Sequence, residues 1–148
     1  MDEKTIFQQQ ANKLYYMACN QDQCPLHAEC LRWLVEKYLP TNLMACTCVN
    51  RHIDGVGTKH CPAFRPKEKV RMGKGMTGIY SDELPRRIER NVRRDIMSLF
   101  CRSYYFEYRK GTRLIPPELQ ETIRGIFRKH GWTQPVEFDE YVDTYQWD

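Results

Sequence analysis

Four cysteines in the first half of the chain have the residue type and spacing of metal ligands. They are Cys19, Cys24, Cys30 and Cys61. Closed structural zinc sites hold four thiolate or imidazole ligands in a tetrahedron. Cys19, Cys24 and Cys61 stand in sequence that is rich in turn-forming residues and poor in apolar ones, so they have little to pack against as buried hydrophobic side chains. We therefore expect the four thiolates to converge on one metal ion.

The spacing between Cys24 and Cys30 restricts the local structure. Six residues of continuous helix would separate the two ligands by about 9 Å along the helix axis, which is too far to share one ion. Residues 25–28 must then form a turn, and a helix begins near Glu29 and runs to about Tyr38. Cys30 would lie in the first helical turn, where free backbone N–H groups stabilise a thiolate.

The sequence also allows other metal ligands and another cofactor. His27 and His60 each lie close in sequence to one of the four cysteines, so either could replace a cysteine as ligand. Cys46 and Cys48 could also bind metal, although small buried residues are the commoner explanation for such a pair. An iron–sulfur cluster is the alternative to zinc because its cysteines can be more widely spaced, but neither standard ferredoxin spacing is present.

Length and composition favour one modest folded domain. The chain has 148 residues, of which 41% are hydrophobic and 28% charged. No apolar run approaches the ~18 residues of a membrane span, and the first residues lack a secretory signal. We therefore expect a cytoplasmic protein. In the cytoplasm thiols stay reduced, so that clustered cysteines favour metal binding over disulfides.

The net charge of +4 is unevenly distributed along the chain. Residues 1–64 are balanced, whereas residues 65–113 hold 14 basic and 6 acidic residues and residues 114–148 hold 3 and 7. A basic centre followed by an acidic tail indicates a surface for an anionic partner.

Eight basic residues of this centre form the candidate nucleic-acid interface. They are Arg86, Arg87, Arg90, Arg93, Arg94, Arg109, Lys110 and Arg113. The first five lie opposite the apolar stripe of a helix predicted to start near Pro85. The others fall on a hairpin predicted at 104–115, where aromatic and polar residues alternate around a Lys110-Gly111 turn. Arginines contact phosphates and aromatic faces stack on unpaired bases. The alternative is a solvated helix face beside a core-facing aromatic stripe.

The remaining patterns predict an α+β fold: a helix-rich single domain with a small sheet or hairpin, stapled by a four-ligand metal site. We divide it into a cysteine part (1–64), a basic part (65–131) and an acidic aromatic tail (132–148) that docks on the core as a helix. Further elements are expected as helices at 5–17 and 117–130, a strand at 43–50, and a loop or short strand at 69–72.

Catalytic motifs are missing from this pattern. Gly73, Gly75 and Gly78 have the spacing of a dinucleotide-binding loop but lack the preceding apolar strand and the βαβ context. We therefore favour a non-enzymatic, metal-stabilised binding protein that contacts nucleic acid. The alternatives are an adaptor for an acidic protein partner and an iron–sulfur redox or metal-sensing protein.

The chain also resembles a known family through motifs spread over nearly its whole length. These motifs are Cys19, Cys24, Cys30-Leu31-Arg32, Cys61-Pro62, Tyr104-Tyr105, Arg109-Lys110, Arg113, Pro116-Pro117, Gln120, Ile123, Phe127, Gly131, Phe138-Asp139, Tyr141, Tyr145 and Trp147. They look like those of small cysteine-containing proteins of gut Bacteroidales grouped as a domain of unknown function. The resemblance implies a bacterial, cytosolic protein and supports the four cysteines as a unit, with Cys46, Cys48 and Cys101 outside it. It implies no activity.

Overall fold

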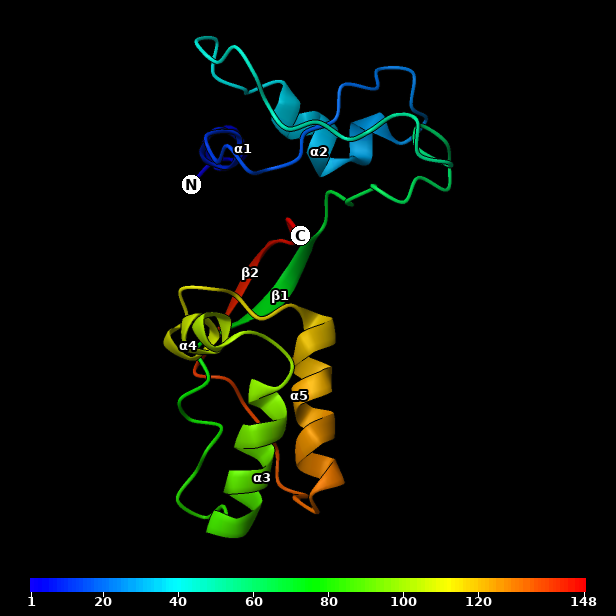
Figure 1. The fold of residues 1–148 in the computed structure, drawn as a ribbon. Coiled ribbons are helices and arrows are strands. Elements are labelled where there is room, and N and C mark those ends of the chain that lie inside the picture. Colours follow the sequence, from blue (N-terminus) through cyan, green and yellow to red (C-terminus); the bar gives the residue numbers. More distant parts are fainter. The chain divides into compact units, whose positions relative to one another are not determined.

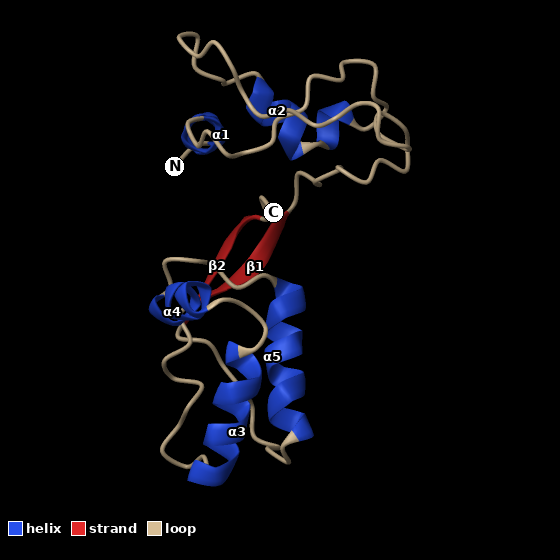
Figure 2. Ribbon diagram, viewed as in Figure 1, coloured by secondary structure: helices blue, strands red, loops and turns tan.

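The computed structural model describes residues 1–148 and has an α+β fold, as the sequence predicts. It contains five α-helices and one two-stranded antiparallel sheet (Figures 1 and 2). The chain divides into two compact units: unit 1 comprises residues 1–68 with 147–148, and unit 2 comprises residues 69–146. None of the helices combines the length and the apolar character that a bilayer span requires.

Unit 1 is built on two short helices, α1 (Glu3–Ala11) and α2 (Leu31–Glu36). The Asp2 side chain caps α1 by accepting a hydrogen bond from the backbone N–H of Thr5 at 2.9 Å. Its core is small and includes Phe7, Ala11, Tyr16, Ala18, Leu31 and Val35. The helix predicted at 5–17 thus exists but ends at Ala11, and residues 12–17 continue as turns and loop.

Two predictions for unit 1 need correction. The helix predicted to begin near Glu29 and to contain Cys30 in its first turn begins at Leu31 instead. A short 3-10 helix (His27–Glu29) occupies the expected turn, and Cys30 precedes α2 as its N-terminal cap residue with φ −104° and ψ 116°. The strand predicted at 43–50 is wrong, because this segment forms only an isolated bridge between Cys48 and Ala18. Most of its residues are exposed, so no neighbouring segment covers its apolar side chains.

Unit 2 pairs its first and last strands. β1 (Lys69–Lys74) runs antiparallel to β2 (Glu140–Tyr145), with Lys69 opposite Tyr145 and Lys74 opposite Glu140. Of the loop or short strand expected at 69–72 the structure has the strand, whereas the helix expected for the C-terminal tail is wrong. The acidic tail pairs with the basic β1, and Lys74 Nζ lies 3.3 Å from Glu140 Oε2.

Three helices form the core of unit 2: α3 (Arg86–Met97), α4 (Arg102–Lys110) and α5 (Pro117–Lys129). Their inward side chains are almost fully buried and comprise Val92, Ile96, Tyr105, Ile123 and Phe127. The buried Gln120 donates hydrogen bonds to the carbonyls of Arg71 at 2.8 Å and Ile115 at 2.9 Å, so that it ties α5 to β1.

The hairpin predicted at 104–115 is wrong, because most of this segment is α4. Tyr104 and Tyr108 are four residues apart, and both contact Arg113, whose guanidinium carbon lies 3.9 Å and 5.8 Å from their ring centroids. Gly111 has φ +80° and ends the helix in the left-handed conformation, a position that glycine also favours in hairpin turns. The four-residue spacing of Tyr104 and Tyr108 fits one face of a helix as well as one face of a strand, which explains the error.

Candidate metal centre

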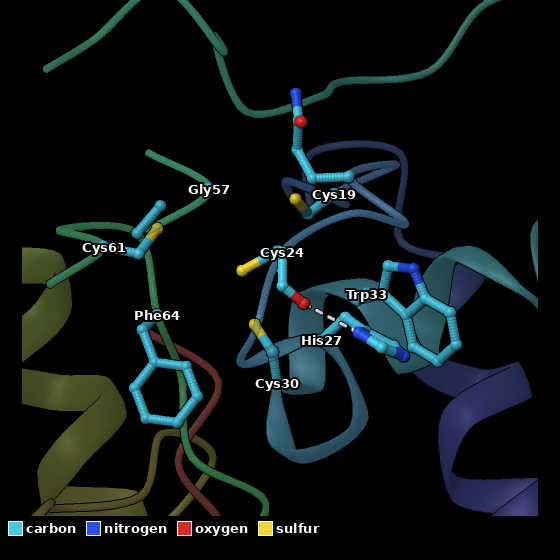
Figure 3. Close-up of a pocket in the computed structure, with 10 residues that line it drawn as sticks. Cys19, Cys24, His27, Cys30, Trp33, Gly57, Cys61 and Phe64 are labelled. Carbon is cyan, nitrogen blue, oxygen red and sulfur yellow. Dashed lines mark hydrogen bonds between the residues drawn. The ribbon is translucent and has the colours of Figure 1, made fainter. Parts of the chain in front are cut away.

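The four predicted ligands meet at one small cavity of unit 1. Cys19, Cys24, Cys30 and Cys61 line a cavity with room for about 10 Å³, and their sulfur atoms face the same space (Figure 3). Cys24 and Cys30 are buried, whereas Cys19 and Cys61 are half-buried. The structure therefore brings together residues that lie up to 42 positions apart in the chain.

Backbone hydrogen bonds hold each cysteine in its place. The N–H of Cys19 donates to the carbonyl of Arg32 at 3.0 Å, which joins the first ligand to α2. Cys24 and Cys61 close tight turns, because their N–H groups donate to the carbonyls of Gln21 and Thr58 at 3.2 Å. Cys30 forms a bridge with Pro66, which brings the chain after Cys61 alongside the start of α2.

Arg32 organises this centre, although the sequence reasoning did not assign it a role. Its side chain is buried, donating to the carbonyl of Ala63 at 3.0 Å and to that of Met17 at 2.9 Å. These two carbonyls belong to the segments that carry Cys61 and Cys19, so one guanidinium joins both to α2. The sequence feature that could have indicated this role is an arginine that directly follows Cys30-Leu31 and stands among apolar residues.

The two histidines differ in their relation to the cavity. His27 lines it, but its Nδ1 lies 2.7 Å from the carbonyl oxygen of Cys24 and its ring packs edge-on against Trp33, with centroids 4.6 Å apart. His60 is exposed and is not among the lining residues. The cavity thus gathers the four cysteines and His27, and it leaves out His60.

The surroundings of Cys19 favour the protonated form of its thiol. Burial raises the pKa of Cys19, and the nearby sulfurs of Cys30, Cys61 and Cys24 add to the effect, whereas a hydrogen bond from the backbone of Gln21 opposes it. No group of three or more His, Cys, Asp or Glu side chains is arranged to coordinate an ion, so the predicted four-ligand staple is not shown as an assembled site.

The remaining cysteines lie outside this cavity. Cys46 and Cys48 are exposed, which contradicts the interpretation that they are small buried residues, and their sulfurs are 3.4 Å apart. Although the residue is exposed, desolvation of its thiol raises the pKa of Cys48 to about 11, and the adjacent Cys46 contributes. Cys101 is exposed at the start of α4, where a hydrogen bond with Ser103 lowers its pKa.

The predicted basic interface is divided by the structure. On α3, Arg86, Arg87 and Arg90 are exposed and take part in no ion pair. Arg93 instead pairs with Glu89 at 2.6 Å, and Arg94 lies 3.4 Å from Asp95.

Aromatic rings of α4 contact nearby arginines, and the guanidinium carbon of Arg102 lies 5.7 Å from the ring centroid of Phe106. Arg113 pairs with Glu107 at 2.8 Å and covers the ring of Tyr104, while Tyr105 is buried. Arg109 and Lys110 lie at the C-terminal end of α4, not in a hairpin. The ring faces expected to stack on bases are therefore mostly used within the protein.

The glycine loop after β1 binds an internal carboxylate. Asp139 accepts hydrogen bonds from the N–H of Thr77 at 2.9 Å, its hydroxyl at 2.7 Å and the N–H of Gly78 at 2.7 Å. A Cβ on Gly75, whose φ is +80°, would lie 2.6 Å from the Asp139 carboxylate. These glycines thus accommodate a side chain of the tail, which agrees with rejecting a dinucleotide site.

Fold and cavity together define a small α+β protein with a centre lined by four thiols. The chain belongs to the family of unknown function DUF6078, whose model matches residues 1–147, and this confirms the resemblance to such a family. No curated protein and no solved structure matches the chain.

Proposed function

We propose that this chain is a non-enzymatic binding protein whose unit 1 is stabilised by one zinc ion on Cys19, Cys24, Cys30 and Cys61, and which contacts nucleic acid through α3. The convergence of the four thiols on one cavity supports the zinc site most strongly. A cavity of about 10 Å³ has room for about one water molecule. That size suits a single ion better than an iron–sulfur cluster, which contains several iron and sulfide atoms.

Charge and stability both favour such a site. Four thiolates around Zn²⁺ leave a net charge of −2, and the buried guanidinium of Arg32 lies between the segments that carry two of the ligands. Unit 1 has a small core, and residues 37–68 contain no helix or strand. Structural zinc supplies roughly 10–16 kcal/mol of apparent binding energy in small domains, enough to fix irregular chain of this kind.

The case for nucleic acid depends on the arginines at the start of α3. Arg86 and Arg87 occupy the first helical turn, where the helix dipole disfavours positive charge, and neither has a carboxylate partner. This helix contains five arginines and only two acidic residues. An arrangement that costs helix stability when the protein is free becomes favourable when phosphates bind, which supports an anion-binding role for this face.

An acidic protein would be attracted to the same arginines and is the second candidate. The two partners can be separated by fluorescence anisotropy with labelled single- and double-stranded DNA and RNA, and with a labelled polyglutamate peptide. Our proposal expects binding to at least one nucleic acid, with an affinity that falls linearly in a plot of log K against log salt. Tighter binding to the peptide than to every nucleic acid would support the adaptor instead. The absence of any nucleic-acid binding at low salt would refute the proposal.

A further inference from the structure

Cys46 and Cys48 form a pair of exposed thiols in contact with each other. Their sulfurs are 3.4 Å apart, and both residues are exposed, in contrast to the four cysteines of the cavity. Neither residue lines that cavity. Two exposed cysteines whose sulfurs are this close are candidates for a disulfide with each other, and exposure is a requirement for reaction with a dissolved partner.

The segment that carries the pair is fixed to the neighbouring chain by three hydrogen bonds. The N–H of Ala18 donates to the carbonyl of Thr47 at 3.0 Å, and the N–H of Val49 donates to the carbonyl of Ala18 at 2.9 Å. The hydroxyl of Thr47 donates to the carbonyl of Leu14 at 3.3 Å. The residue between the two cysteines is thus held through both its backbone and its side chain, which keeps the thiols together.

We propose that Cys46 and Cys48 are a redox-active dithiol that reacts with low-molecular-weight disulfides by thiol–disulfide exchange. One thiolate attacks a sulfur of the disulfide, forms a mixed disulfide and releases the other half as a thiolate. The second protein thiolate then attacks the sulfur of its neighbour, forms the Cys46–Cys48 disulfide and releases the remaining half. The pair loses two electrons, the small disulfide gains them, and the two thiol protons pass to the released thiolates.

Cys101 is an internal control for this reaction. Cys101 is exposed like the pair, but its sulfur contacts the hydroxyl of Ser103 at 3.1 Å instead of a second thiol. A mixed disulfide on Cys101 therefore has no neighbouring thiol to resolve it. A mixed disulfide on Cys46 or Cys48 does, because the second thiol is present at a high effective concentration.

The test is to incubate the reduced full-length protein with oxidised glutathione, block free thiols with an alkylating agent and analyse tryptic peptides by mass spectrometry. Cleavage after Lys37 and Arg51 gives a peptide in which Cys46 and Cys48 are the only cysteines. We expect this peptide to lose two hydrogen atoms and to carry glutathione at least about tenfold less often than the Cys101 peptide does.

Variants Cys46→Ser and Cys48→Ser complete the test, and both positions are exposed, so the fold should tolerate the change. In each variant the remaining cysteine should retain the glutathione that it takes up, because no neighbouring thiol is left to displace it. Three results would overturn the proposal: glutathione retained on the wild-type pair as on Cys101, disulfides that link two protein molecules through this peptide, or thiols that stay unmodified while Cys101 reacts.

Discussion

Replacing Arg86, Arg87 and Arg90 together by glutamine should weaken nucleic-acid binding while making unit 2 more stable. Glutamine has a helix propensity close to that of arginine, so the substitution removes charge without disturbing the helix. All three side chains are exposed and make no ion pair that would be lost. A substitution that weakens binding but raises the free energy of unfolding indicates residues whose role is to bind a ligand.

The size of both effects follows from the position of the arginines. Each phosphate contact contributes about 0.9 to the slope of log K against log salt on double-stranded DNA, so three lost contacts reduce the slope by about 2.7 and the affinity by several hundred-fold near 0.1 M salt. Removing two positive charges from the first turn of α3 should raise the free energy of unfolding by about 1 kcal/mol.

Anisotropy over a range of salt concentrations measures the first effect, and urea unfolding followed by circular dichroism measures the second. The matched control is Arg128→Gln on α5, an exposed arginine that pairs with Glu121 at 2.5 Å and should leave binding close to that of the wild type. If the triple variant keeps the wild-type affinity and salt slope, the interface is wrongly assigned. If it is less stable than the wild type, the dipole reasoning is wrong.

Three further predictions concern unit 2 and are measured by urea unfolding. A hydrogen bond from His130, and a second one from Lys129, hold the pKa of Asp95 at about 2, below the ordinary value of 3.8. The contribution of Asp95 to stability is therefore complete above about pH 3.8 and is lost as the pH falls toward 2. Asp95→Asn should remove this part of the acid dependence, and an unchanged pH profile would contradict the assignment. Asp139→Ala removes the hydrogen bonds from the exposed Thr77 and Gly78, which water can replace, and should cost about 1 kcal/mol, with a neutral result arguing against the loop anchor. Phe127→Ala should cost about 3–5 kcal/mol and Phe127→Leu clearly less, since the ring is fully buried; equal costs would contradict the packing.

The sequence was sufficient to predict the elements that depend on local patterns. The helices α3 and α5 follow from apolar residues at helical spacing, with Gly131 at φ +83° just beyond the end of α5. The cysteines could be grouped because Cys19, Cys24 and Cys61 stand in turn-rich sequence, where burial alone gives them little stabilisation. The spacing of Cys24 and Cys30 predicted a helix that begins near Glu29, two residues before the observed start of α2 at Leu31.

The errors arose where distant contacts decide the structure. β2 is a strand because it pairs with β1, about 70 residues earlier, and no local signal carries that information. The role of Arg32 depends on carbonyl groups of Met17 and Ala63, which lie 15 and 31 residues away. The segment 104–115 was assigned from the alternation of its aromatic residues, although the burial of Tyr105 and the contacts of Arg113 fit a helix.

Elemental analysis combined with native mass spectrometry of protein purified without added metal tests the central claim most directly. We predict one zinc ion per chain, released on acidification because the thiolates must then take up protons. Serine variants of Cys19, Cys24, Cys30 and Cys61 should each lose the metal, whereas Cys101→Ser should retain it. A folded chain that contains no metal, with all four of these thiols free to react with an alkylating agent, would contradict the account.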